Sequence, residues 1–475
     1  MTDQAEVLRQ AIDPFWEREI LPALEDYIRI PNLSVDFDPQ WQSHGHMERA
    51  RTLALDWLRA HAPDHWTVHS PTLPGRTPLI LVDIPGDCEA TVLIYGHLDK
   101  QPEMEGWSEG LGPWEPVRRE ERLYGRGGAD DGYALFAAVA AVRALDQQGA
   151  AHPRIVLLVE FSEESGSPDL PAYLEAHGAL IGQPDLVIAL DSGAGDYQRL
   201  WSTTSLRGVL SCNLTVQVLE EGVHSGLASG LIPSSMDVMR CLLDRLQDPA
   251  TGAVRLQALQ AAVPDQRREQ ARRAADILGG SIIETLPTVA GLRGLTQDPA
   301  EGVLNSTWRP TLSVTGQDGL PPVGSAGNVL RPHTTLKLSF RLPPTVDWRA
   351  AREAIRGVLT RDPPHGARVE ATFDHGGNGW DAPALAPWLA RATDEASRTF
   401  YGREAAYVGL GGSIPFMAML GERFPEAQFL ITGVLGPHSN AHGPNEFLHI
   451  PYAKRLTACI AHIVARHPAV DGPAP

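Results

Sequence analysis

The sequence contains few cysteines and no long apolar run. Its four cysteines, Cys88, Cys212, Cys241 and Cys459, lie far apart, and none forms a CxxC pair. This spacing excludes a disulfide framework and a thiolate zinc site. No segment approaches the roughly 18 apolar residues that a membrane helix needs, and the polar first residues lack a signal-peptide core. We therefore expect a soluble, cytoplasmic protein without a membrane partner.

Positive charge is also scarce. Lys and Arg number 40 against 58 Asp and Glu, which gives a formal net charge of -18. Such a surface repels phosphate backbones and anionic membranes, so nucleic acid is excluded as a partner. The acidic excess is compatible with a solvated surface or with carboxylates gathered around cations. Charge alone does not identify a ligand.

Two common functional motifs are missing as well. No Gly-x-Ser-x-Gly elbow occurs, which disfavours a serine hydrolase. The glycine-rich stretch from Gly125 to Gly128 resembles a phosphate loop, but no P-loop lysine follows it. The two aspartates that do follow, Asp130 and Asp131, would repel phosphate. Nucleotide binding is therefore not predicted here.

The chain does contain enough apolar sequence for two domains. Its 475 residues, 43% of them hydrophobic, exceed what one core usually sustains. Helices are predicted over Ala5–Arg29 and Ala134–Leu145, and short apolar strands surround the second helix. This alternation predicts an α/β fold with a mixed, mainly parallel sheet flanked by helices. The predicted strands are Leu79–Ile84, Thr91–Tyr95, Ile155–Phe161 and Leu186–Leu190.

The pattern changes near Leu206. Alternating strands over Leu210–Val218 and Thr335–Arg341 are each followed by an amphipathic helix, over Ser234–Leu246 and Trp348–Leu359. This order predicts an inserted α+β unit, a two-layer sandwich that interrupts the first domain. The expected boundaries are 1–205 and 384–475 for the two parts of the first domain, and 206–383 for the insertion.

Two pairs of polar residues follow predicted strands. In Tyr95-Gly96-His97-Leu98-Asp99, the histidine and the aspartate are two residues apart and share a face of an extended segment. Asp99 can thus orient the imidazole of His97 for a metal, although a capped strand end is the alternative. Glu163 and Glu164 follow the predicted strand Ile155–Phe161. One of them can bind a cation while the other takes a proton. A solvated loop is the alternative there.

Three further candidates complete the set. Asp130 ends the glycine-rich turn, where a helix cap is the alternative, Asp191 ends another strand, and His442 lies in a late His-Gly-Pro-Asn-Glu segment. Strand ends gather at the carboxyl edge of an open α/β sheet. Two imidazoles and three carboxylates without a thiolate suit two divalent ions roughly 3.5 to 4 Å apart.

The order of these motifs, His-x-Asp, Gly-Arg-Gly-x-x-Asp-Asp, Glu-Glu, Asp and His-x-x-Asn-Glu, resembles the M20 family of dinuclear zinc peptidases, and in particular its dipeptidase-like carnosinase group. The resemblance implies that the interrupted domain is catalytic and that the insertion is a lid and dimerisation domain. It also implies that His97 and Asp191 hold one metal, Glu164 and His442 hold the other, and Asp130 bridges both.

The resemblance assigns two further roles near the metals. Glu163 corresponds to the general base that takes a proton from the attacking water and passes it to the leaving amine, and Asp99 corresponds to the residue that orients His97. Two Zn²⁺ ions are the expected cofactors, with Mn²⁺ or Co²⁺ as alternatives.

Five residues at the lid resemble substrate contacts of the family. His224, in Val223-His224-Ser225-Gly226, corresponds to a lid histidine that reaches the partner's active site in dimeric members, which implies a homodimer. Arg341 and Asn328 lie at positions of substrate contacts, and Gly412 and Ser413 lie in a turn that holds the substrate carboxylate. A surface ion pair for Arg341 and an ordinary turn at Ser413 are the alternatives.

The chain departs from the family pattern at two places. Gly132 and Tyr133 replace the usual lysine and glycine after the paired aspartates. Lys100 follows Asp99 where apolar residues are common, and we expect it to add a cation near the rim of the cleft.

The resulting hypothesis is a metal-dependent hydrolase of dipeptides or similar small amides. In the family, aspartate at the position of Asp191 tends to accompany substrates with a free amine. The alternatives are an N-acyl-amino-acid deacylase or carboxypeptidase, for which the substrate is an acyl-amino acid or a peptide, and a catalytically silent binding protein on the same scaffold.

Overall fold

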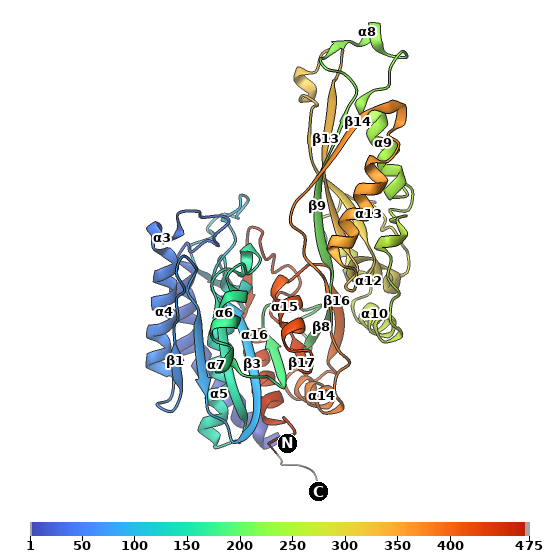
Figure 1. The fold of residues 1–475 in the computed structure, drawn as a ribbon. Helices are drawn as coiled ribbons and strands as arrows, with labels where there is room; N and C mark the ends of the chain where they lie inside the picture. The colour runs from blue at the N-terminus through green and yellow to red at the C-terminus, as the bar shows by residue number, and fades with distance from the viewer. Residues whose placement is uncertain (1, 471–475) are drawn as a thin grey trace. The chain divides into compact units, whose positions relative to one another are not determined.

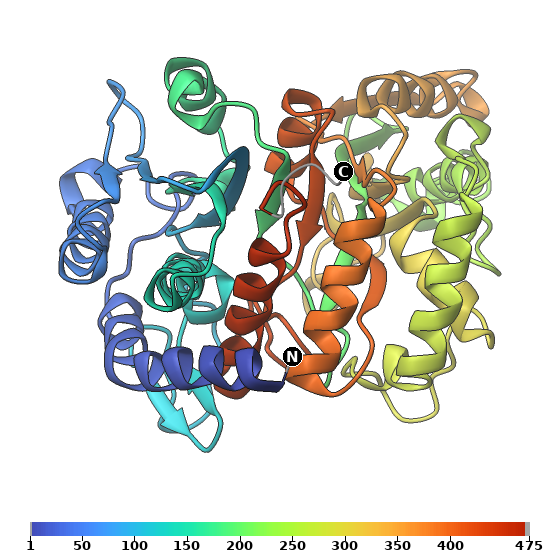
Figure 2. The ribbon, with the colours of Figure 1, turned by 90° about the horizontal axis from the view of Figure 1, so that it is seen from below.

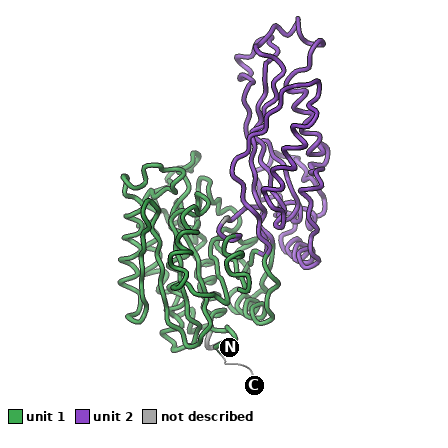
Figure 3. The backbone as a smooth tube through the Cα atoms, in the orientation of Figure 1, with its two compact units in different colours: residues 1–203, 382–408, 419–475 green, residues 204–381, 409–418 purple. Residues whose placement is uncertain are grey.

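The computed structural model describes residues 2–470, which form two compact units. Unit 1 comprises Met1–Thr203, Ala382–Val408 and Met419–Pro475, and unit 2 comprises Thr204–Asp381 and Gly409–Ala418 (Figure 3). The first unit is therefore assembled from three separated stretches of chain. Residues 409–418, which the sequence pattern groups with the last stretch, pack within unit 2.

A large mixed sheet forms the centre of unit 1 (Figure 1). Its strands follow the order β1-β2-β6-β3-β7-β17-β8, and β16 also pairs with β8. The middle strands β6, β3, β7 and β17 run parallel to one another, whereas β2 is antiparallel to β6 and β8 is antiparallel to β17. The strand bounds are β1 Thr67–His69, β2 Ile80–Ile84, β3 Cys88–His97, β6 Pro153–Glu160, β7 Leu186–Ala189, β8 Trp201–Leu206, β16 Ala406–Leu410 and β17 Gln428–Ile431.

Helices flank this sheet, as the sequence predicts (Figure 2). Helix α5 is buried along nearly its whole length because it packs between β3 and the helices α1 and α16. The first predicted helix is divided by a π-helical turn at Trp16–Ile20 into α1 and α2. The helix bounds are α1 Thr2–Phe15, α2 Leu21–Ile28, α3 Trp41–His44, α4 His46–His61, α5 Tyr133–Gln148, α6 Leu170–Ala176, α7 Gly178–Ile181, α14 Pro387–Tyr401, α15 Pro415–Arg423 and α16 Ile450–Ala465.

A small antiparallel sheet joins two loops of unit 1. Strand β18 (Phe447–His449) pairs with β5 (Arg122–Tyr124), which pairs with β4 (Val117–Arg119). The pairing sets Phe447 opposite Tyr124. Because Gly125 follows β5 and His442 precedes β18, this short ladder brings the glycine-rich turn and the late histidine loop together.

Unit 2 is a two-layer sandwich. Four antiparallel strands in the order β11-β13-β9-β14 carry helices α9 and α13. Burial alternates along β9 and β13, and their inward residues pack with α9 and α13 in one apolar core. The bounds are β9 Gly208–Gln217, β11 Thr311–Asp318, β13 His333–Leu342, β14 Arg368–Phe373, α9 Ser235–Leu246 and α13 Trp348–Thr360.

The remaining elements of unit 2 are short or peripheral. Strands β10 (Val223–His224) and β12 (Val329–Leu330) pair with each other, and the short strand β15 (Trp380–Asp381) also lies in unit 2. The other helices are α8 Ser225–Ala228, α10 Asp265–Leu278, α11 Ser281–Glu284 and α12 Pro299–Thr307. Across the part of the chain that the structure describes, we find no helix of sufficient length and apolarity to span a membrane.

Candidate metal centre

Three parallel strands of unit 1 end at one edge of the sheet. Strand β3 ends at His97, β6 ends at Glu160, and β7 ends two residues before Asp191. The ladder pairs His97 with Glu160 and Tyr95 with Ala189, so the chain exits of these strands are neighbours. The crevice beyond this edge is where open α/β sheets bind ligands.

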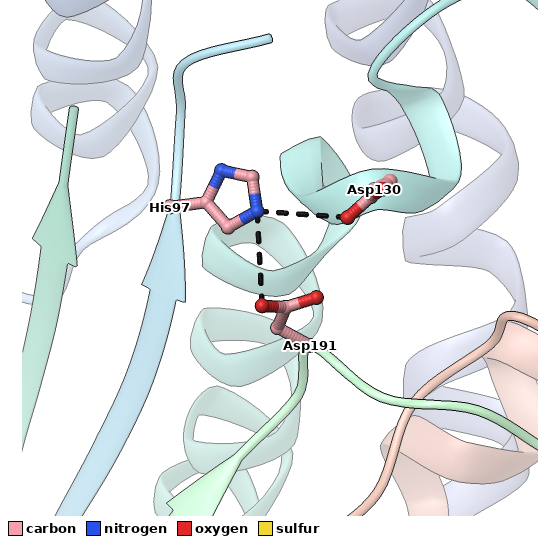
Figure 4. Close-up of side chains that lie close together, drawn as sticks. All are labelled: His97, Asp130 and Asp191. Carbon is pink, nitrogen blue, oxygen red and sulfur yellow. Dashed lines mark ion pairs between the residues drawn. The ribbon is translucent and has the colours of Figure 1, made fainter. Parts of the chain in front are cut away.

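His97 is surrounded by carboxylates at this edge. Its Nε2 atom lies 3.6 Å from Asp130 Oδ1 and 3.9 Å from Asp191 Oδ2 (Figure 4). The imidazole is fully buried, and Nε2 has no hydrogen-bond partner among the described residues. A buried ring nitrogen without a partner is costly unless another ligand satisfies it, so its surroundings fit a metal ion.

A second group of donors meets at the other oxygen of Asp130. His442 Nε2 lies 3.0 Å from Asp130 Oδ2 and 3.2 Å from Glu164 Oε2. Within each group, His97, Asp130 and Asp191 or Asp130, Glu164 and His442, the donor atoms lie within 4.8 Å of one another. Asp130 thus belongs to both groups. Imidazole and carboxylate donors without a thiolate fit zinc, manganese or cobalt.

The electrostatics of the crevice also favour cations. Burial raises the pKa of Asp191 to about 8, and burial followed by the charge of Asp130 raises the pKa of Glu164. Burial acts the same way on Asp130, but the neighbouring imidazoles of His442 and His97 lower the pKa of that carboxyl below its ordinary value. Several buried carboxylates at one place repel one another unless positive charge compensates them.

Asp99 connects the imidazole of His97 to the glutamate turn. Its Oδ1 atom lies 3.4 Å from His97 Nδ1 and accepts a hydrogen bond from the backbone N–H of Glu163 at 3.1 Å. Its Oδ2 atom accepts from the N–H of Glu164 at 3.0 Å. This fully buried carboxylate therefore holds the turn Glu163–Ser165 beside β3.

Glu163 faces the same crevice. Its Oε2 atom lies 4.0 Å from His97 Nε2, and its side chain is almost buried. Burial, followed by the charge of Asp191, raises the pKa of Glu163 well above its ordinary value. A carboxylate with a raised pKa is a stronger proton acceptor, as a general base requires.

A buried ion pair between Arg126 and Glu446, which the sequence pattern does not predict, joins the two loops of the second group. Arg126 Nη1 donates to Glu446 Oε2 at 2.6 Å, and both side chains are buried. Arg126 also donates to the carbonyl of Gly443, while Glu446 Oε1 accepts from the N–H groups of Gly127 and Ala129. The pair thereby fixes the turn that carries Asp130 against the loop that carries His442.

The expectation that Lys100 adds a cation near the cleft rim is wrong. The Lys100 side chain is fully buried, and its Nζ atom donates to the carbonyls of Tyr27 and Ile30 at 2.7 and 2.8 Å. The ammonium also lies 3.8 Å from the centre of the Tyr27 ring. Carbonyls at the end of helix α2 attract this cation into the interior, because they carry the negative end of the helix dipole.

Packing explains the unusual Gly132-Tyr133 pair. A Cβ atom at Gly132 would lie 2.3 Å from Tyr27 Cε1 and 2.5 Å from the carbonyl oxygen of Gly127. No larger side chain fits there without displacement of its neighbours. The Tyr133 ring is buried, and its hydroxyl donates to the carbonyl of Leu190, next to Asp191.

Within unit 2, the predicted substrate contacts form two groups. Arg341 Nη1 donates to Ser413 Oγ at 3.2 Å, and Gly412 precedes that serine. No ion pair of the described residues includes Arg341, which argues against the surface ion pair considered as its alternative. At the other group, His224 is exposed, its Nδ1 accepts from the N–H of Gly226, and the carbonyl of Asn328 accepts from the N–H of Ser225.

The chain is similar in sequence to known proteins. Residues 93–466 match the sequence model of Peptidase family M20/M25/M40. The chain is 27% identical to cysteinylglycine-S-conjugate dipeptidase of Corynebacterium striatum over 81% of this chain and 84% of that protein. It is 25% identical to human Beta-Ala-His dipeptidase over 88% of this chain and 82% of that protein.

Solved structures share the fold. The Saccharomyces cerevisiae dipeptidase Dug1p aligns with a TM-score of 0.75 at 21% identity and covers 100% of both chains. Human carnosine dipeptidase 1 aligns with a TM-score of 0.74 at 22% identity over 97% of this chain and 98% of that one. The family match covers more than half of the chain and confirms the predicted relationship: the protein is a hydrolase that belongs to Peptidase family M20/M25/M40.

Proposed function

We propose that the protein is a metallodipeptidase that hydrolyses dipeptides with a free amine and a free carboxylate. The observation that carries this proposal is the position of Asp130, whose two oxygens belong to two separate groups of donor atoms. A carboxylate between two cation sites is suited to a dinuclear hydrolase. The relatives named as dipeptidases support the substrate class.

The metal ligands follow from the two groups. His97 and Asp191 would hold one divalent ion, Glu164 and His442 would hold the second, and Asp130 would contact both. We propose Zn²⁺ as the bound ion, and the same donors also accept Mn²⁺ or Co²⁺. When bound, such ions supply Lewis acidity, which makes water easier to deprotonate near neutral pH.

Glu163 is the proposed general base. Its raised pKa and its position beside His97 support transfer of a proton from the attacking water to its carboxylate. The same carboxyl group would then deliver that proton to the leaving amine. Asp99 would keep both the His97 ring and the Glu163 backbone in place, because it contacts each of them.

Unit 2 is the proposed lid, and it would supply the substrate contacts. The Arg341 guanidinium, with Gly412 and Ser413, would bind the carboxylate end of the dipeptide. Because His224 Nδ1 accepts a hydrogen bond from Gly226, the neutral ring carries its proton on Nε2, which can donate to a developing oxyanion. Asn328 would contact the substrate beside His224.

The test compares a dipeptide with its N-acetyl form on protein loaded with each metal. We expect hydrolysis of the free dipeptide, loss of activity after chelation, and a decrease of about 100-fold or more in the Glu163→Ala variant, whose metal content should not change. Hydrolysis of only the acetylated compound would instead establish a deacylase. Bound metal without any hydrolysis would establish a silent binding protein.

A homodimer through unit 2 is part of this proposal, with His224 acting in the partner's active site. Two inactive variants, His224→Ala and Asp130→Ala, would be mixed, unfolded and refolded together. Partial recovery of activity is expected, because mixed dimers would contain one site with all its groups intact. Analytical ultracentrifugation that finds only monomers, or no recovery after mixing, would argue against this arrangement.

A further inference from the structure

Two arginines of unit 2, Arg207 and Arg341, lie close together. Arg207, which directly precedes strand β9, is only 8% exposed, and Arg341 is partly buried on the neighbouring strand β13. The ladder pairs Val209 with Arg341. Among the described residues, no carboxylate forms an ion pair with either guanidinium. Buried cations are usually paired, so this arrangement needs an explanation.

The hydrogen bonds of Arg207 lead to one turn. Its Nε donates to the carbonyl of Gly411 at 3.1 Å, and its own backbone carbonyl accepts from Ser413 Oγ at 2.6 Å. Ser413 Oγ in turn accepts from Arg341 Nη1. Arg207 thus holds both ends of the turn Gly411–Ser413. Its side chain donates to Gly411, and its main-chain carbonyl accepts from Ser413.

The other face of the guanidinium is fixed by the chain around α12. Arg207 Nη1 lies within hydrogen-bond distance of the carbonyls of Asn305 and Arg309 and of Thr311 Oγ1. Thr311 is the residue opposite Arg341 on strand β11. Arg207 therefore joins three segments, the turn, the end of α12 and the strand beside Arg341, and its hydrogen bonds satisfy it without neutralising its charge.

We propose that Arg207 is a positioning residue for the substrate carboxylate: it fixes Ser413 beside Arg341, and its uncompensated charge makes this place selective for a free carboxylate over an uncharged end. The inference rests on the proposed dipeptidase function and deepens it. Burial, followed by the charge of Arg341, lowers the pKa of Arg207 to about 10, so the guanidinium remains charged at neutral pH. Two neighbouring positive charges attract an anion more strongly than Arg341 would alone.

The test measures kcat and KM for a dipeptide and for the same dipeptide with a C-terminal carboxamide. In Arg207→Met, we expect KM for the free dipeptide to rise about tenfold or more, within the range of a lost charged hydrogen-bond contact. Because Arg207 does not touch the reacting atoms, kcat and the KM of the carboxamide should change little. The preference for the free acid would therefore decrease.

A matched control distinguishes this role from general support of the fold. Arg245 also donates to backbone carbonyls of unit 2, those of Val358, Arg361 and Asp362, and does not contact the turn. Arg245→Met should leave the acid-to-amide preference unchanged. Arg207→Lys keeps the charge with fewer donors and should give an intermediate preference, which is decisive if the methionine variant does not fold.

The outcomes separate two failures. If the wild-type protein hydrolyses neither compound, the proposed function fails and the role of Arg207 fails with it. If the wild-type protein prefers the free acid and folded Arg207 variants keep the same preference, or lose activity toward both compounds equally, only the inference about Arg207 is overturned. Circular dichroism and metal content establish that each variant is folded.

Discussion

At the scale of single residues, space rather than backbone conformation limits which side chain can follow the turn that carries Asp130. Gly132 has φ -52° and ψ -28°, which any residue can adopt. The restriction comes from the buried Tyr27 ring and the Gly127 carbonyl, both close to the position that a Cβ atom would occupy. The Tyr27 ring also lies beneath the ammonium of Lys100, so both this cation and the turn at Gly132 restrict its movement. The departure from the family pattern is therefore a feature of local packing.

Gly132→Ala should lower the stability of the protein. The added methyl group must displace Tyr27 or the turn, and such overpacking costs about 1 to 3 kcal/mol. Gly357→Ala is a suitable control, because Gly357 lies within helix α13 and a Cβ atom there meets nothing within 4 Å. That control should instead gain about 0.5 to 1 kcal/mol. Urea denaturation measures both, and equal stability of the Gly132 variant would disprove the crowding.

At the scale of elements, buried polar pairs connect segments that are distant in the sequence. Arg126 and Glu446 join the glycine-rich turn to the loop before β18, and the short ladder of β5 and β18 supports the same connection. Burial raises the pKa of Glu446 to about 7, opposed by the charge of Arg126. Removal of one partner leaves the other as an uncompensated buried group, which is the costly case for a buried ion pair.

Arg126→Met should destabilise the protein by about 3 to 5 kcal/mol, the usual cost of breaking a buried pair. It should also weaken metal binding, because the loop that carries His442 loses its anchor. Arg118→Met is the matched control, since Arg118 pairs with Glu25 at a more exposed place, where a pair contributes at most about 1 kcal/mol. Metal titration and thermal unfolding of both variants test this, and similar losses in the two would contradict it.

A second polar pair predicts how stability depends on pH. His152, before β6, lies 3.1 Å from Asp146 on α5. Burial opposes protonation of His152, but its hydrogen bond to Asp146 raises its pKa above the ordinary 6.5. Burial likewise opposes ionisation of Asp146, but hydrogen bonds from His152 and Trp66 lower the pKa of Asp146 below 3.8. Each partner thus favours the charged form of the other.

Between pH 4 and 6.5, both contributions should be present. The His152 contribution is complete below 6.5 and is lost as the pH rises through its raised pKa, whereas the Asp146 contribution is lost as the pH falls through its lowered pKa. His152→Gln should remove the part of the stability decrease above pH 6.5 that this histidine causes. Asp146→Asn should do the same. Unfolding free energies at several pH values measure it, and unchanged slopes in both variants would refute it.

The sequence predicted these elements unevenly, for physical reasons. The parallel strands that lead to His97, Glu163 and Asp191 carry a continuous apolar run followed by an abrupt polar exit, and both signals are local. No bounds were predicted for strands β11 and β14, because exposed and partly buried residues dominate them and the apolar contrast is small. The burial of Lys100 could not be predicted, because its partners are carbonyls some seventy positions earlier in the chain. The homodimer and the cytoplasmic location stay predictions.

At the scale of the whole molecule, the two groups of candidate metal ligands connect five separated segments of unit 1. The donors lie between residues 97 and 442, at the ends of strands and in loops. Binding of ions would therefore oppose the separation of these segments on unfolding. Carboxylates gathered without ions would repel one another and favour the unfolded chain.

Removal of metal should consequently lower the melting temperature. An ion present at a hundred times its Kd contributes about 2.7 kcal/mol to the stability of the folded state. Thermal unfolding after chelation, and again after metal is restored, measures the effect. His442→Ala should show a smaller shift, because it lacks one donor of the second group. Identical melting with and without chelator would exclude bound metal as a stabilising ligand.

The grouping of residues 409–418 with unit 2 has a consequence for protein engineering. In a chimera, residues 204–381 alone could be taken from another family member. The turn Gly411–Ser413 would then still come from this protein, whereas the residues at the positions of Arg207 and Arg341 would come from the other one. The two parts of the proposed carboxylate-binding site would then come from different proteins and would not match. If the proposed function holds, transfer of substrate preference requires two exchanges, residues 204–381 and residues 409–418.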